Sequence, residues 1–292
     1  MITRGLEAAT KGMMSLLKQE DVNANNLANV NTVGFKKTNI TFKNLMQADV
    51  EVKQVPITNN PKDTQFIRVG SLSLGNAADR TYIDFSQGGL ITTGNKLDVG
   101  IQGKGFFKIR HQEVPDNVPY DEKNYYYTRA GNFQMTDDYY LVTKEGDWVM
   151  DTQNRRIRIV LNPEDENNNP NNRIDSLKDL NIGENGVIQI TNPDTPRTLQ
   201  QIQIVDFDDK TLLSAQLGEG KFIQEEGIDA GMHQSNQSAR LQQGMLESSN
   251  TNTIYEMINT ITVTRSYEAM AKIVKTQGDT VSKAINLGTV NR

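Results

Sequence analysis

The two ends of this chain carry long helical patterns of apolar residues, whereas the stretch between them is patterned like strands. From Ile2 to Val30, steps of four and three residues meet apolar side chains everywhere except at Glu20 and Asn23. A heptad pattern that persists over about four repeats is typical of a helix that packs along a seam. Polar residues within a seam lower its stability but fix its register and its partner.

A second helix is expected from about Thr253 to Asn286. The phase of its apolar pattern shifts between Ile261 and Val263, so that apolar side chains fall on more than one face. A helix that is apolar on several sides is buried on several sides. Seams at both ends of a chain need each other or neighbouring copies of the protein, which indicates assembly rather than catalysis.

The composition excludes several functional classes. The chain has 292 residues and a net charge of -5, which gives no indication of a nucleic-acid partner, because such partners attract a basic patch. It contains no cysteine, which excludes disulfides, thiolate catalysis and cysteine-bound metals. No apolar run is long enough for a transmembrane segment, and the first residues lack the apolar core of a secretory signal. We therefore expect any export to use a route without a cleaved signal peptide.

The region between the helices divides into an extended arm, a β domain and a return linker. Residues 33–79 have scattered apolar residues with Pro and Gly, which is typical of an arm outside the core. Residues 80–229 contain short alternating segments separated by turn sequences, which predicts an antiparallel sandwich or a partly closed barrel. Residues 230–252 are expected to be a return linker. The candidate strands are Thr81–Phe85, Lys96–Ile101, Gly105–Ile109, Tyr125–Thr128, Arg156–Val160 and Gln201–Phe207.

The fold class predicted by this organisation is α+β. The terminal segments, residues 1–32 and 253–292, are expected to form a coiled-coil-like helical domain, and the middle a separate all-β domain.

We find no residue spacing that predicts a catalytic, cofactor or metal site. The histidines, His111 and His233, are far apart and have no carboxylate cluster nearby, which argues against zinc. The glycine-rich segment 100–105 contains a lysine but lacks the spacing of a phosphate-binding loop, and a strand pattern follows it. We interpret this segment as a tight hairpin turn. The sequence therefore predicts a protein that is not an enzyme and has no cofactor.

Several motifs resemble those of the bacterial flagellar axial proteins, specifically the basal-body rod proteins and their hook relatives. The first motif spans Asn25–Lys37, directly after the first helical pattern. The second spans Gly89–Phe107 in the β region and continues at Tyr127–Phe133. The third spans Gly244–Asn250 and continues into the last helical pattern at Arg265–Ala269. The resemblance extends from one end of the chain to the other.

The resemblance implies a structural subunit of the flagellar rod, which polymerises through its terminal helices into a helical tube and transmits torque from the motor to the hook. Its implied partners are copies of itself, other rod and hook subunits, and the flagellar type III export apparatus. No nucleic acid and no transmembrane segment are expected. The implied location is the basal body, in a rod that spans the periplasm if the cell is Gram-negative.

The resemblance also assigns roles to particular residues. Helix contacts would be made by Leu6, Met13, Leu16, Leu27, Ile254, Ile258, Ile261, Tyr267 and Met270. The turn after the first helix would be shaped by Asn26, Asn29, Asn31, Gly34 and Phe35, since Asn and Gly tolerate the left-handed backbone conformation.

Two alternatives remain open at this point. The first is a hook subunit of the same family. The second is a soluble, β-rich surface or carbohydrate-binding protein. That alternative needs an exposed aromatic platform, for which Tyr125–Tyr127 is the candidate.

Overall fold

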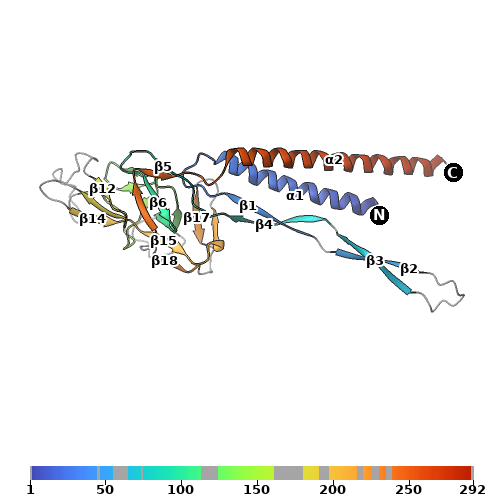
Figure 1. The fold of residues 1–292 in the computed structure, drawn as a ribbon, viewed down its shortest axis with the longest axis horizontal. Helices are drawn as coiled ribbons and strands as arrows, with labels where there is room; N and C mark the ends of the chain where they lie inside the picture. Colours follow the sequence, from blue (N-terminus) through green and yellow to red (C-terminus); the bar gives the residue numbers. More distant parts are fainter. Residues whose placement is uncertain are drawn as a thin grey trace. The chain divides into compact units, whose positions relative to one another are not determined.

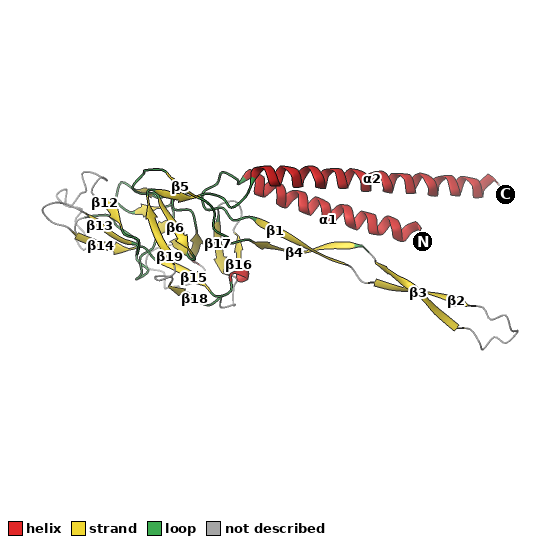
Figure 2. Cartoon of the chain, in the orientation of Figure 1, coloured by secondary structure: helices red, strands yellow, loops and turns green. Residues whose placement is uncertain are grey.

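A computed structural model of the chain forms two compact units (Figures 1 and 2). The helix unit comprises Met1–Leu27, Thr38–Tyr82 and Asn252–Arg292, and the β unit comprises Ala28–Lys37 and Ile83–Thr251. The α+β class is confirmed. The structure describes residues 2–44, 47–54, 65–73, 75–112, 124–160, 180–190, 197–215, 220–224, 230–234 and 239–290.

Two long helices, α1 (Ile2–Ala28) and α2 (Thr253–Val290), lie side by side in the helix unit (Figure 1). They run antiparallel, since Gly12 faces Met270 whereas Gly5 faces Gln277. A Cβ atom added at Gly12 would lie 3.1 Å from the Met270 Sδ, so the helices approach closely there because glycine has no side chain. Over the described part of the chain, no helix is long and apolar enough to cross a membrane.

Local sequence explains where α2 begins. The side chain of Asn252 accepts hydrogen bonds from the backbone N–H groups of Ile254, at 3.0 Å, and Tyr255, at 3.2 Å. This is the arrangement of an N-cap residue, which satisfies N–H groups that have no partner within the helix.

The arm forms two-stranded antiparallel ribbons in its described parts. Strand β1 (Thr38–Asn44) pairs with β4 (Asn76–Ile83), and β2 (Gln47–Gln54) pairs with β3 (Gln65–Ser73). Helix α1 contacts this arm, because the Ser15 hydroxyl donates a hydrogen bond of 3.1 Å to the backbone oxygen of Asn76. The sequence predicted an extended arm here, and its strands pair with each other.

The β unit is built from antiparallel sheets. The largest described sheet has the order β16–β17–β8–β7–β11–β10–β9, with β15 joining β7 to β18. Smaller sheets pair β12–β13–β14, β19–β6 and β20–β5. The strands of the β unit are β5 (Leu90–Thr92), β6 (Val99–Gly103), β7 (Phe106–Arg110), β8 (Tyr125–Thr128), β9 (Gln134–Met135), β10 (Leu141–Val142), β11 (Trp148–Val149), β12 (Leu180–Ile182), β13 (Val187–Ile190), β14 (Arg197–Gln201), β15 (Ile204–Phe207), β16 (Leu213–Ala215), β17 (Lys221–Gln224), β18 (Met232–Gln234), β19 (Ala239–Gln243) and β20 (Met245–Glu247), with a 3-10 helix, η4 (Lys210–Leu212).

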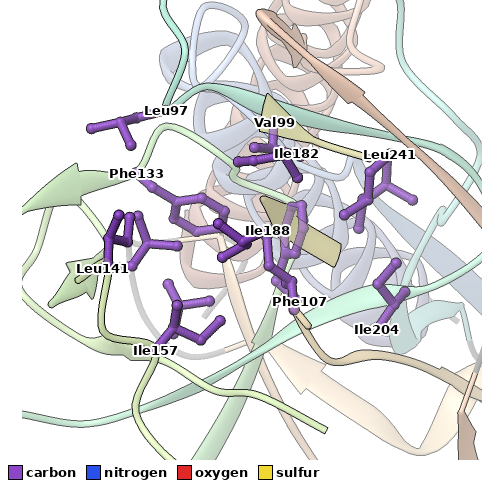
Figure 3. Close-up of a cluster of buried hydrophobic side chains, with 14 of the residues drawn as sticks. Leu97, Val99, Phe107, Phe133, Leu141, Ile157, Ile182, Ile188, Ile204 and Leu241 are labelled. Carbon is purple, nitrogen blue, oxygen red and sulfur yellow. The ribbon is translucent and has the colours of Figure 1, made fainter. Parts of the chain in front are cut away.

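Two clusters of buried apolar side chains form the core of the β unit. Successive residues of a strand point to opposite faces, so β7 contributes Phe107 to the larger cluster and Phe106 to the smaller one. Strand β15 divides in the same way, with Ile204 in the larger cluster and Val205 in the smaller. Figure 3 shows the larger cluster, in which side chains from several strands point toward one another.

Some sequence-based expectations differ from the structure. Segment 100–105 is not a hairpin, because β6 pairs with β19 whereas β7 pairs with β8, β11 and β15. Gly103 and Gly105 have positive φ angles of 103° and 137°, which carry the chain from one sheet to another instead. Residues 156–160 form isolated bridges rather than a strand.

The boundaries of the segments also differ from those expected. The expected return linker, residues 230–252, contains β18, β19 and β20, and up to Thr251 it belongs to the β unit. Helix α1 ends at Ala28 rather than residue 32, and Ala28–Lys37 also belongs to the β unit. These two segments are polar and show little periodicity, so the sequence did not indicate that they belong to the β unit.

Candidate assembly surface

The strongest surface feature of the helix unit is a row of exposed, large apolar side chains on the first half of α2. Ile254, Met257, Ile258 and Ile261 are at positions i, i+3, i+4 and i+7, which lie on one side of an α-helix, and Tyr255 lies at the edge of this row. We name this surface the α2 ridge; it consists of Ile254 (71% exposed), Tyr255 (63%), Met257 (48%), Ile258 (56%) and Ile261 (53%). Isolated exposed apolar residues are common, but a contiguous row marks an interaction surface.

A different face of α2 is turned inward. Glu256 and Val263 are buried, at 0% and 4% exposure, and Met270 contacts α1 at Gly12. The expected phase shift between Ile261 and Val263 therefore separates an exposed apolar face from a packed one.

The predicted helix-contact residues fall into two groups. Ile254, Ile258 and Ile261 are in the exposed ridge, and Leu6 on α1 is also exposed, at 38%. The others are half-buried within the helix unit: Met13, Leu16, Leu27, Tyr267 and Met270. The structure thus places the first group where a neighbouring molecule could reach it and the second within the subunit.

A shallow groove on the same unit offers a second, different apolar surface. It lies between α1 and β4 and has a volume of about 190 Å³. It is lined by Lys11, Met14, Ser15, Lys18 and Asn76–Ala78. The ridge and the groove belong to different elements, the ridge to α2 and the groove to α1 and β4.

The predicted turn residues after α1 have distinct structural roles. The buried Asn26 side chain bonds both backbone groups of Thr38, donating to its oxygen at 2.8 Å and accepting from its N–H at 3.0 Å. Asn29 closes a turn by accepting the Thr32 N–H at 3.1 Å. The side chain of Asn31 is exposed.

Gly34 and Phe35 complete this turn inside the β unit. Gly34 has a φ of 69°, as the sequence predicts, and its N–H donates to the backbone oxygen of Glu247 at 2.8 Å. A Cβ atom at Gly34 would lie 2.4 Å from the backbone nitrogen of Ala130, so no other residue fits. Phe35 is 9% exposed and contributes to the core.

A buried ion cluster joins the three sequence motifs, and sequence reasoning missed it. Lys36 from the first motif and Arg129 from the second both contact the carboxylate of Glu247 from the third, at 2.7 Å and 3.1 Å. All three side chains are at most 3% exposed. The Gly88 N–H and the Ser86 backbone oxygen also take part, at 2.8 Å to Glu247 and 2.7 Å to Lys36.

Burial sets the electrostatics of this cluster. Desolvation lowers the pKa of Lys36 below its ordinary value of 10.5, and the opposite charge of Glu247 works against this shift. Arg129 adds to the lowering of this pKa, whereas Asp84 opposes it. A buried charge pair of this kind is costly to break, because one partner is left without compensation.

The aromatic platform required by a carbohydrate-binding function is not formed by Tyr125–Tyr127. Tyr125 and Tyr127 are 6% and 1% exposed, and Tyr126 packs against the larger apolar cluster. In the described part of the chain, no group of three metal-ligating side chains comes together.

Comparison with known families agrees with these features. A model described as flagella basal body rod protein matches residues 6–36, one for the D1 domain of the flagellar hook protein FlgE/F/G matches 100–190, and one for the C-terminal part of the flagellar basal body rod proteins FlgEFG matches 242–287. The three matches contain Lys36, Arg129 and Glu247, respectively.

Whole-chain relatives extend the match over the regions between these models. The flagellar basal-body rod protein FlgG of Borreliella burgdorferi is 32% identical over 97% of this chain and 98% of its own length. FlgG of Bacillus subtilis is 27% identical over 97% of this chain and 98% of its own length, and FlgF of Caulobacter vibrioides is 27% identical over 95% of each.

Three family-model matches, spread over a chain with two terminal helices and a central β unit, define a protein of the flagellar axial class. Within that class, the chain belongs to the flagellar basal-body rod protein family. This family is structural, so the chain is a rod protein of the basal body and not an enzyme.

Proposed function

We propose that the chain polymerises with copies of itself, through α1 and α2, into a helical tube that transmits torque from the motor to the hook. The α2 ridge is the observation that carries this proposal. Fully burying a large apolar side chain is worth about 1.5–3 kcal/mol, so covering the ridge with a neighbouring subunit contributes favourably to association. The other rod subunits and the hook subunits are the further partners.

The finer features of this function follow from the same helices. The antiparallel contact of α1 and α2 at Gly12 and Gly5 supports a coiled-coil-like pairing in the assembled tube. The nine residues Leu6, Met13, Leu16, Leu27, Ile254, Ile258, Ile261, Tyr267 and Met270 are proposed to carry the helix contacts. We further propose export through the flagellar type III apparatus and a rod that spans the periplasm of a Gram-negative cell.

Substitution of Ile258 on the ridge tests the proposal. Ile258→Asp places a charge on the ridge, and we expect the variant to be absent from basal bodies purified from cells that express it as their only copy. Ile258→Leu keeps an apolar side chain of equal size and is the matched control. The helical signal in far-UV circular dichroism reports whether α1 and α2 are formed in both variants. Wild-type incorporation of Ile258→Asp would refute assembly through this ridge.

A further inference from the structure

The chain passes between the two units at several points. At three of these points, the nearby residues of the β unit lie next to one another. It leaves the β unit after Lys37 and after Thr251, and it returns to the β unit at Ile83. In the sequence these points are far apart. In the β unit, the residues beside them are Lys37, Asp84 and Asn250, and each is hydrogen-bonded to the other two.

Asn250 makes two of these contacts with its side chain. Its Oδ1 accepts the backbone N–H of Lys37 at 2.8 Å, and its Nδ2 donates to the backbone oxygen of Asp84 at 2.8 Å. The same Nδ2 lies 3.0 Å from the Ser86 hydroxyl. The third contact joins the other two segments directly, since the Asp84 N–H donates to the Lys37 oxygen at 2.8 Å.

The buried ion cluster anchors the same three segments one layer deeper. Lys36 precedes Lys37, Ser86 follows Asp84, and Glu247 comes three positions before Asn250. Lys36 contacts both the Ser86 oxygen and the Glu247 carboxylate at 2.7 Å. Hydrogen bonds between charged groups are about twice as strong as neutral ones, so this layer holds the segments in register.

We propose that Asn250 is a positioning residue, which holds together, within the β unit, the ends of the three segments that carry Lys37, Asp84 and Asn250. The ion cluster and the bond between Asp84 and Lys37 already join these segments, and the Asn250 side chain fixes their outermost residues, which should loosen first when it is removed. This tie is a property of the free subunit and does not depend on the proposed function.

Amide hydrogen exchange of the full-length, unpolymerised subunit tests the tie. In Asn250→Ala we expect exchange at residues 37 and 84 to rise together, by tenfold or more, although the two are distant in sequence. Peptides from the core strands β6 and β7 should keep their protection. The matched control is Asn95→Ala in the same unit, whose side chain bonds Asp98 and Leu97 nearby in sequence, at 3.1 Å and 3.3 Å. In this control, amide exchange at residues 37 and 84 should be the same as in the wild type.

Two results would overturn the proposal. One is unchanged exchange at residues 37 and 84 in Asn250→Ala. The other is an even rise throughout the β unit, which would make Asn250 an ordinary contributor to stability. If Asn250→Ala does not fold, as judged by Trp148 fluorescence, Asn250→Ser provides a smaller change with the same readout. Because the measurement uses free subunits, it is independent of the Ile258 test of polymerisation.

Discussion

Replacing Gly34 by alanine should destabilise the β unit by an amount that the structure allows us to work out. A residue with a side chain costs about 1–2 kcal/mol more than glycine in the left-handed conformation. The added Cβ would also lie 2.4 Å from the Ala130 nitrogen and 2.5 Å from the Arg129 carbonyl carbon, both of which are backbone atoms that cannot rotate away. Overpacking of this kind typically costs about 1–3 kcal/mol.

Together these contributions amount to about 2–5 kcal/mol, a large part of the roughly 5–15 kcal/mol that stabilises an ordinary domain. The assay is urea unfolding followed by Trp148 fluorescence, since Trp148 lies in β11 of the β unit. With a slope of about 2 kcal/mol per M, the midpoint should fall by about 1 M or more.

Gly94→Ala is the matched control for this experiment. Gly94 also has a positive φ, of 75°, but an added Cβ would meet no atom within 4 Å. It therefore reports the conformational cost alone, about 1–2 kcal/mol. If Gly34→Ala destabilises the β unit no more than Gly94→Ala does, the turn does not pack on Arg129 and Ala130, and the reasoning is refuted.

Three further predictions concern the helix unit and the ion cluster. Asn26→Ala leaves both backbone groups of Thr38 without their partner and should cost about 1–3 kcal/mol, seen as faster amide exchange at Thr38; unchanged exchange would contradict this role. Leu27→Asp should abolish incorporation into basal bodies while the Trp148 unfolding curve stays as in the wild type, and normal incorporation would argue against the predicted seam. Because the pKa of Lys36 is lowered from 10.5 in the folded protein, the unfolded chain binds more protons in the window just below 10.5, so raising the pH through that window should stabilise the wild type relative to Lys36→Met. Parallel urea titrations of the two proteins across this pH range measure the difference, and a constant difference would exclude the shift.

Local sequence patterns predicted the helices and the turn after the first helix, because these elements depend on residues that are close together in the sequence. A heptad pattern predicted the first helix, a phase-shifted apolar pattern predicted the second, and Gly34 was predicted as a turn position with positive φ. The change of apolar face near Ile261 predicted a helix buried on several sides, but in the single subunit one apolar side, that of Ile254, Ile258 and Ile261, is exposed.

Contacts between distant segments left no such pattern. Lys36 and Glu247 are 211 positions apart, and the basic pair formed by Lys36 and Lys37 is typical of a solvated edge, although Lys36 is buried. The membership of β18, β19 and β20 in the β unit was missed for the same reason, since their polar residues depend on pairing partners elsewhere in the chain. Only the resemblance of the surrounding motifs singled out these regions.

The position of β7 between the two apolar clusters has a consequence for how the β unit folds. Phe106 and Phe107 are adjacent, yet they belong to different clusters, so neither cluster can lose β7 without disturbing the other. The two clusters should therefore melt in one cooperative transition rather than as separate foldons. A subunit of this design has no stable half-folded form of its β unit. It is either an unfolded chain or a complete building block.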